Sequence, residues 1–228
     1  MTTRRERLRA ATIEEIKEAA LSQIAEVGGP ALSLRGVARE IEMSPAGLYR
    51  YYDGRDALLT DLIVDAYNAL ADAVEVGIES GGESASERFA AGIRAYRRWG
   101  VDNPNRFLLI FGTPIPGYAA PEGGPTVAAN RRMGEAFFMV GVEAWRAGQL
   151  HPQPLGREIT QAEMQLSSEI DPNLPAELIP SMLGSWAHFH GLVNLEVLNQ
   201  WHWLYGTHTE EFFEGEIQAI LRAMGMSG

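Results

Sequence analysis

Residues 49–52 read Tyr-Arg-Tyr-Tyr and follow shortly after a Ser44-Pro45 step. Phenol hydroxyls and a guanidinium are groups that hydrogen-bond to phosphate oxygens, and such contacts position a nucleic acid without reading its sequence. The spacing therefore favours phosphate binding. From periodicity alone, packing of the tyrosines within a small helical bundle explains the same pattern equally well.

Local signals place this segment in the third of three short helices. Thr12 opens a Thr-x-x-Glu capping-box pattern, and the helix that follows ends at residues 28–30, Gly-Gly-Pro. Ser33 can cap a second helix. Ser44 with Pro45 can open a third, because the first turn of a helix does not need the N–H that proline lacks. The tight turn between the second and third helices predicts a helix-turn-helix.

In such a unit the third helix enters the major groove of DNA with its N-terminus first. The small residues from Ser44 to Gly47 would then approach base edges, while the tyrosines and Arg50 would lie at phosphates. Arg55 opens the next helix, where its guanidinium and the N-terminal amides of that helix could share a phosphate.

The charge of the chain is unevenly distributed. Its net charge is −11, yet residues 1–55 hold nine Lys/Arg against eight Asp/Glu, and the remainder holds ten against 22. Four arginines over residues 4–9 make the N-terminal arm locally basic. A basic arm can meet phosphates, whereas an acidic body is repelled by them. A charge asymmetry of this size is common in globular proteins, so it supports DNA binding only together with the helix-turn-helix motif.

The stretch from Ser33 to Leu59 resembles the DNA-binding signature of the TetR family of bacterial regulators. The matching positions are Ala38, Ser44, Leu48, Tyr49, Tyr51, Tyr52, Arg55, Asp56 and Leu58. The resemblance covers about residues 10–58 and implies that Ser33, Tyr49, Tyr51 and Arg55 contact phosphates, while the first turn of the third helix reads bases. The predicted DNA-facing set is Ser33, Arg35, Ser44, Pro45, Ala46, Gly47, Tyr49, Arg50, Tyr51 and Arg55.

Two positions depart from the family pattern. Glu42 stands in the turn where the family usually has Gly, and Gly47 stands where it often has Thr. If position 42 is left-handed, Glu costs about 1 kcal/mol relative to Gly.

Helical signals continue over the rest of the chain, and no strand-like alternation persists. We expect a long helix after Asp53-Gly54 and further helices over about 84–99, 126–149, 176–205 and 209–225. Asn103-Pro104 restarts the chain into an apolar run from Phe107 to Phe111. Loops are expected over 113–125 and, with one short helix, over 151–175. The predicted fold class is all-α. A three-helix DNA-binding domain over residues 1–56 precedes a helical-bundle domain for ligand binding and dimerisation over residues 57–228.

The second half carries the features expected of a small-molecule site. Residues 186–191, Trp-Ala-His-Phe-His-Gly, together with Glu196, resemble the Trp-His-Gly motif of one C-terminal domain type found in TetR-like regulators. Arg94, Arg97 and Arg98 could attract an anionic effector or form solvated surface. Apolar and aromatic side chains with a few polar groups are typical of such sites, although closed core packing explains them as well: Trp99, Phe107, Phe111, Met133, Phe137, Trp145, Trp186 and His190.

The two last helices have extensive apolar faces. The family resemblance places them in a two-fold interface, and packing inside one chain is the alternative. A dimer suits the first half, because two helix-turn-helix heads must reach successive major grooves about 34–36 Å apart. The expected partners are a palindromic double-stranded DNA operator, a small-molecule effector and a second copy of the chain.

Several classes of protein are not expected. The chain lacks Cys, which excludes disulfides and thiol catalysis. No His pair has the i,i+4 spacing that would chelate a metal, and no nucleophile motif or Gly-rich phosphate loop suggests an enzyme or a cofactor. No signal peptide and no apolar run of about 20 residues is found, so we expect a cytoplasmic protein without a membrane span. The hypothesis is a ligand-responsive repressor, with an activator or an effector-independent DNA binder of the same fold as alternatives.

Overall fold

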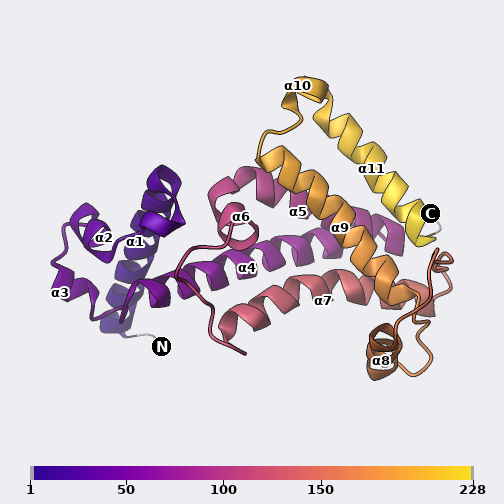
Figure 1. The fold of residues 1–228 in the computed structure, drawn as a ribbon, viewed down its shortest axis with the longest axis horizontal. Helices are drawn as coiled ribbons and strands as arrows, with labels where there is room; N and C mark the ends of the chain where they lie inside the picture. The colour runs from indigo at the N-terminus through magenta and orange to yellow at the C-terminus, as the bar shows by residue number, and fades with distance from the viewer. Residues whose placement is uncertain (1–2, 227–228) are drawn as a thin grey trace. The chain divides into compact units, whose positions relative to one another are not determined.

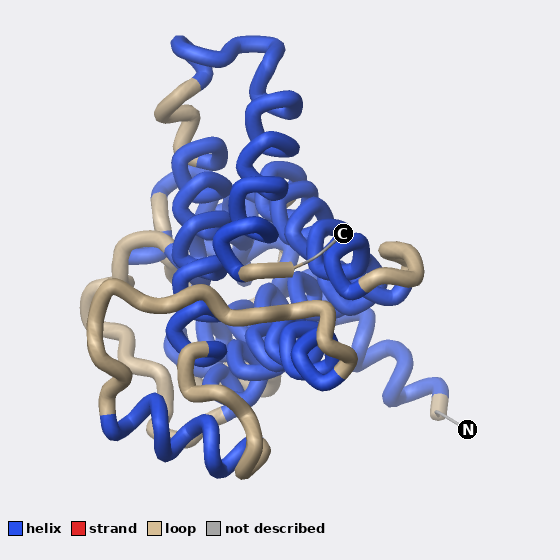
Figure 2. The backbone as a smooth tube through the Cα atoms, turned by 90° about the vertical axis from the view of Figure 1, so that its right-hand side faces the viewer, coloured by secondary structure: helices blue, strands red, loops and turns tan. Residues whose placement is uncertain are grey.

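The computed structural model describes residues 3–226, which form helices and loops without a named strand (Figure 2). The all-α prediction is confirmed. None of the helices in this part of the chain has the length and apolar character needed to cross a bilayer. The helices, labelled in Figure 1, are α1 (Arg4–Val27), α2 (Leu34–Glu40), α3 (Pro45–Leu48), α4 (Arg55–Glu79), α5 (Ala85–Asp102), α6 (Pro104–Phe111), α7 (Pro125–Arg146), α8 (Gln161–Ile170), α9 (Leu178–Val197), α10 (His202–Tyr205) and α11 (Thr209–Met224).

The chain divides into two compact units. The first comprises the chain up to Ala69 together with Asn103–Asn130, and the second comprises Leu70–Asp102 and the chain from Arg131 onward. Helices α4 and α7 each supply residues to both units. The functional division proposed at residue 56 remains a prediction.

The core of the first unit lies among α1, α2, α3 and the start of α4. Ile16, Val37, Leu48 and Leu58 are fully buried there. Two residues of the loop after α6 also pack against this core, namely Ile115 and Tyr118. The predicted Pro- and Gly-rich loop is therefore part of the compact unit that carries α3.

Side-chain caps begin the short helices as predicted. The Ser33 Oγ accepts a hydrogen bond from the Gly36 amide, and the Ser44 Oγ accepts one from the Gly47 amide at 3.1 Å. Pro45 occupies the first turn of α3. These two caps fix where α2 and α3 begin, because each satisfies an amide that the first turn leaves unpaired.

The predicted start of α1, after a cap at Thr12, is wrong. The helix begins nine positions earlier than predicted, at Arg4, with a capping box between Thr3 and Glu6. The Thr12 hydroxyl instead donates to the Leu8 carbonyl inside the helix. The same Thr-x-x-Glu pattern occurs twice, and the Arg-, Leu- and Ala-rich segment between the two copies is made of good helix formers, so the first copy sets the start.

In the second unit, α5, α9 and α11 pack against one another around aromatic side chains. Phe89, Tyr96 and Phe189 are almost completely buried there. The helix predicted over 176–205 is interrupted, because Asn199 adopts a left-handed conformation (φ 55°) after α9 and the chain restarts at α10. Asparagine tolerates this conformation better than most residues, which makes it a common helix terminator.

Candidate nucleic-acid interface

The turn between α2 and α3 has a left-handed residue at its centre. The Met43 amide donates to the Ala38 carbonyl at 2.8 Å, and this bond closes the turn around Glu42, whose φ is 54°. Leu48, fully buried, anchors α3 to the core from the other side. Position 42 is therefore left-handed, which is the condition under which Glu costs about 1 kcal/mol relative to Gly.

Replacing Glu42 with Gly should stabilise the first unit by about 1 kcal/mol, because glycine adopts a positive φ without steric strain. Denaturant unfolding followed by circular dichroism measures this change. Glu40→Gly is the matched control, since Glu40 ends α2 without a positive φ and glycine there should not stabilise the unit. A Glu42→Gly variant that is less stable than the wild type would contradict this interpretation of the turn.

Most of the predicted DNA-facing residues are exposed on the first unit. Gly47 and Tyr51 are half-buried, and Tyr49 is 51% exposed. Tyr52, by contrast, faces the core. The exposed members are Ser33, Arg35, Ser44, Pro45, Ala46, Tyr49 and Arg50.

The neighbouring side chains explain why glycine stands at position 47. A Cβ added there would lie 3.0 Å from Cγ of Met43 and 3.2 Å from the capping Oγ of Ser44. A threonine at this position would therefore crowd the cap that begins α3. Gly47 departs from the family pattern because Met43 leaves little room for a larger side chain at this position.

Arg55 has a partner within the protein. One guanidinium nitrogen donates to the Gly29 carbonyl at 3.0 Å and is 3.4 Å from the Pro30 carbonyl. These bonds join the start of α4 to the 3-10 turn that follows α1. A phosphate contact by Arg55, as predicted, would thus compete with these internal hydrogen bonds.

A polar network between α1 and α4 was missed by sequence reasoning. Lys17, the single lysine of the chain, is buried, and its Nζ lies 2.6 Å from Asp65 and 3.1 Å from Asp61. The Tyr52 hydroxyl donates to the same Asp61 carboxylate at 2.6 Å. The sequence signal that could have indicated this network is a lysine directly beside Ile16 on the apolar face of the first helix.

Both partners of these carboxylates have shifted pKa values. Burial disfavours the charged amine of Lys17, but hydrogen bonds to Asp65 and Asp61 outweigh it and raise its pKa. Burial, followed by the hydrogen bond to Asp61, raises the pKa of the Tyr52 phenol. The network therefore holds a protonated lysine and a neutral tyrosine across the neutral pH range.

The predicted ligand-binding residues divide between the two units. Phe107 and Phe111 belong to the first unit, where their rings are 5.0 Å apart and Phe111 also packs edge-to-face on Tyr67. The other six, Trp99, Met133, Phe137, Trp145, Trp186 and His190, belong to the second.

Within the second unit these residues form packed core with one exposed edge. Trp99, Met133 and Phe137 are buried, and Phe137 contacts Phe89 and Phe189. Trp186 is 36% exposed and stacks on His190 at 4.9 Å between ring centroids.

His190 connects this exposed edge to the buried core. Its Nδ1 lies 2.8 Å from the hydroxyl of the fully buried Tyr96. Burial lowers the pKa of His190, so its imidazole is neutral at pH 7.

Two of the three arginines considered for an anionic effector are already paired. Arg94 makes two 2.7 Å hydrogen bonds to Glu214, and Arg97 makes two to Glu196. Arg98 is exposed. The paired arginines join α5 to α11 and α9, so their charge is used in packing the bundle.

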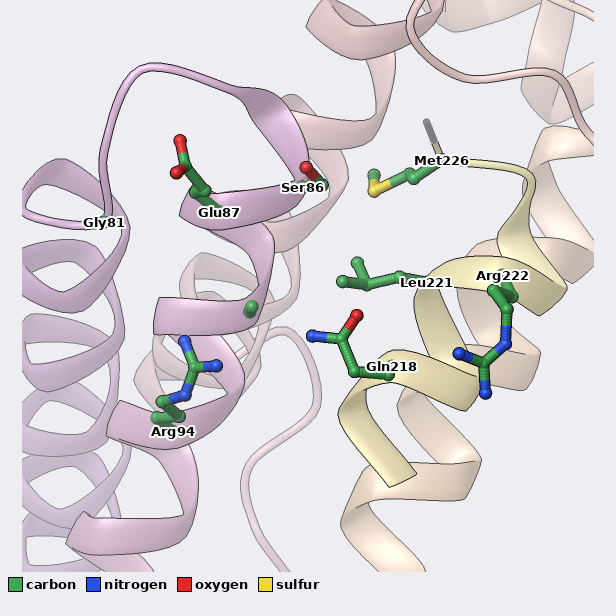
Figure 3. Close-up of a pocket in the computed structure, with 9 residues that line it drawn as sticks. Gly81, Ser86, Glu87, Arg94, Gln218, Leu221, Arg222 and Met226 are labelled. Carbon is green, nitrogen blue, oxygen red and sulfur yellow. The ribbon is translucent and has the colours of Figure 1, made fainter. Parts of the chain in front are cut away.

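A groove of about 540 Å³ lies between α5 and α11 in the second unit. Figure 3 shows the Gln218 amide and the Leu221 side chain pointing into the space between the helices, with Arg94 across from them. Its lining consists of Gly81, Ser86, Glu87, Ala90, Arg94, Gln218, Leu221, Arg222 and Met226. It contains none of the eight predicted aromatic, Met and His ligand residues, but it includes Arg94, one of the three arginines considered for an anionic effector. Among residues 3–226 no group of three His, Asp or Glu side chains is arranged to hold a metal ion.

Comparison with known proteins matches both halves of the chain. The family described as "Bacterial regulatory proteins, tetR family" matches residues 16–62, and "Tetracyclin repressor-like, C-terminal domain" matches residues 89–220. The chain is 34% identical over 194 residues to the HTH-type transcriptional regulator Rv1816 of Mycobacterium tuberculosis (strain ATCC 25618 / H37Rv), a match that covers 82% of this chain and 81% of that protein.

Solved structures share the fold. The regulatory protein SCO4313 is 33% identical, with a TM-score of 0.78 over 96% of this chain and 100% of the other. A bacterial regulatory protein in the tetR family from Rhodococcus RHA1 is 17% identical, with a TM-score of 0.67 over 95% and 98% of the two chains, and shows the fold alone.

Proposed function

The chain belongs to the TetR family of DNA-binding transcriptional regulators, and on this premise we propose that it is a ligand-responsive repressor. It binds a palindromic operator as a homodimer in the cytoplasm, where bacterial DNA lies, and a small apolar or amphipathic effector releases it. The exposed face of α3, with Tyr49 and Arg50 beyond a capped and glycine-containing first turn, carries the proposal. The regulator family and the fold indicate a transcription factor without enzymatic activity.

The DNA contacts that we propose divide by residue type. The small first turn of α3 lets the backbone approach base edges closely, and the backbone of DNA is held by Tyr49 and Arg50. Ser33, Arg35 and Tyr51 extend the same surface toward phosphates.

Dimerisation through the last two helices is supported by one face of α9. Apart from Asn194, the positions that share a sector of about 120° on this helix are apolar or small, and all are exposed or half-buried. Glycines at 184 and 191 have no neighbouring atom within 4 Å of an added Cβ. A second copy can therefore approach closely along this face, formed by Leu183, Gly184, Ala187, Gly191, Leu195 and Leu198.

Release requires that the effector bind the non-DNA-binding conformation more tightly than the DNA-binding one. The loop after α6 supplies a physical connection within the first unit. Gly29, whose carbonyl holds Arg55, leaves room for the Ile115 side chain, and the Tyr118 hydroxyl lies 3.0 Å from that of Thr60. A displacement of α6 and its loop would therefore act on Gly29, which holds Arg55, and on the start of α4.

Tyr49→Phe should weaken binding to every duplex by a similar factor of about fivefold, because it removes one hydroxyl bond to a phosphate oxygen and leaves the ring in place. Fluorescence anisotropy with an operator selected from random DNA, and with a scrambled duplex, measures both affinities. Tyr205→Phe, in the second unit, is the control and should bind as the wild type does. An unchanged affinity of the Tyr49→Phe variant would remove Tyr49 from the interface.

The effector site that we propose is the aromatic set around Phe137 and His190. A metabolite screen by thermal shift identifies a stabilising compound, and two variants then locate it. His190→Ala should abolish the ligand-dependent shift, whereas Gln218→Ala should retain it. If His190→Ala retains the shift and Gln218→Ala abolishes it, the effector binds in the groove between α5 and α11 instead.

Transcription in vitro from a promoter overlapping the selected operator tests the direction of regulation. Addition of the protein should lower transcript yield, and the stabilising compound should restore it. A rise in yield would identify an activator, and indifference to every compound would identify an effector-independent DNA binder.

A further inference from the structure

The N-terminal arm is the capped first part of α1 and carries exposed arginines. The Thr3 amide donates to Glu6 Oε2 at 2.6 Å, and the Glu6 amide donates to Thr3 Oγ1 at 3.2 Å. This reciprocal cap begins α1 at Arg4, so all four arginines of the arm lie within the helix. Their side chains, at positions 4, 5, 7 and 9, are exposed.

One arginine of the arm touches the segment that follows α3. The guanidinium carbon of Arg9 lies 4.9 Å above the centre of the Tyr51 ring. Tyr51 in turn packs against the hydrophobic core of the first unit. A cation over an aromatic face is attracted to it, so Arg9 is held beside the DNA-facing surface while it remains accessible.

The helical repeat places a second arginine in line with the first. Arg5 precedes Arg9 by four residues, which puts it about 40° away around the helix and about 6 Å further along its axis. Arg4 lies about 140° away from Arg9 by the same repeat. Arg5 and Arg9 thus share the side of α1 that faces Tyr51, and Arg4 does not.

The first turn of α3 itself provides little positive charge. Pro45, Ala46 and Gly47 are uncharged, and in residues 44–52 Arg50 is the single basic side chain. Affinity for duplex DNA comes largely from neutralised phosphates. An acidic protein with so few cations on its recognition helix needs further phosphate contacts.

We propose that Arg5 and Arg9 form a second DNA contact, which binds the phosphate backbone beside the base pairs covered by α3. This inference rests on the proposed function and adds a binding surface to it. Tyr51 then acts as a support that orients Arg9. The stretch of duplex that the protein covers is accordingly longer than the segment read by α3.

Three single substitutions with the same change of charge test this surface. Arg5→Gln and Arg9→Gln should each weaken operator binding about fivefold at 0.15 M salt. Each should also reduce the slope of log K against log salt by about 1.8, because the dimer loses one phosphate contact in each of its two chains. Arg4→Gln, on the other side of the helix, should bind within twofold of the wild type. Anisotropy over a range of salt concentrations measures all four proteins, and circular dichroism confirms that each is folded.

Two results would overturn the inference. An Arg4→Gln variant as weak as Arg5→Gln would show that only net charge matters, and unchanged affinity in Arg5→Gln and Arg9→Gln would show that the arm makes no contact. Both leave DNA binding by the wild type intact. Failure of the wild-type protein to bind any duplex would instead reject the proposed function.

Discussion

Leu183→Glu should convert the protein into a monomer and lower its affinity for a palindromic operator at least about 100-fold. Leu183 is 59% exposed on the apolar face of α9, so the wild-type side chain is available to a partner. A carboxylate there would be desolvated in the interface without a counter-charge. Two linked heads bind far more tightly than one, and separated heads lose this advantage.

Sedimentation velocity and anisotropy on the same samples measure the two effects together. Leu166→Glu is the matched control, because Leu166 is 45% exposed on α8, outside the proposed interface. This variant should remain dimeric and bind the operator normally. A dimeric Leu183→Glu protein with full affinity would contradict an interface through α9.

Lys17→Met should lower the free energy of unfolding of the first unit by about 2–3 kcal/mol. The substitution leaves the carboxylates of Asp61 and Asp65 facing α1 without their cation, while methionine keeps most of the side-chain volume. Chemical denaturation followed by circular dichroism measures the loss. Arg131→Met is the control, since its ion pair with Glu135 is largely exposed and should contribute less than about 1 kcal/mol.

The same network has an alkaline pH dependence. Because the pKa of Lys17 is raised by folding above its usual 10.5, its contribution is complete below that value and is lost as the pH rises through the folded-state pKa. The raised pKa of Tyr52 acts in the same direction. The difference in free energy of unfolding between wild type and Lys17→Met should therefore be smaller at about pH 11 than at about pH 8. An equal difference at both pH values would contradict the role of the lysine charge.

Local signals predicted the parts of the DNA-binding unit that depend on neighbouring residues. Ser33 and Ser44 cap the expected helices, and Glu42 adopts the left-handed conformation that a family glycine would have supplied. Each of these features is decided within about five residues of the chain. The start of α1 was misplaced because two identical capping patterns compete over the same segment.

Features that join distant segments could not be predicted in this way. Lys17 meets carboxylates 44 and 48 positions later, and Arg55 finds carbonyls at Gly29 and Pro30. Composition predicts an aromatic second half but does not distinguish a cavity from a packed core. Phe137 lies in such a core, whereas the groove between α5 and α11 arises where two helices far apart in sequence meet.

The central claim is that the exposed face of α3 binds duplex DNA in a symmetric pair. Selection of bound duplexes from random DNA with the purified full-length protein, followed by sedimentation of the complex, tests it most directly. We predict enrichment of an inverted repeat whose half-sites lie about one helical turn apart, bound by two chains with an affinity that falls steeply with salt. Recovery of no enriched sequence, from a protein that remains a single chain in the presence of DNA, would contradict this claim.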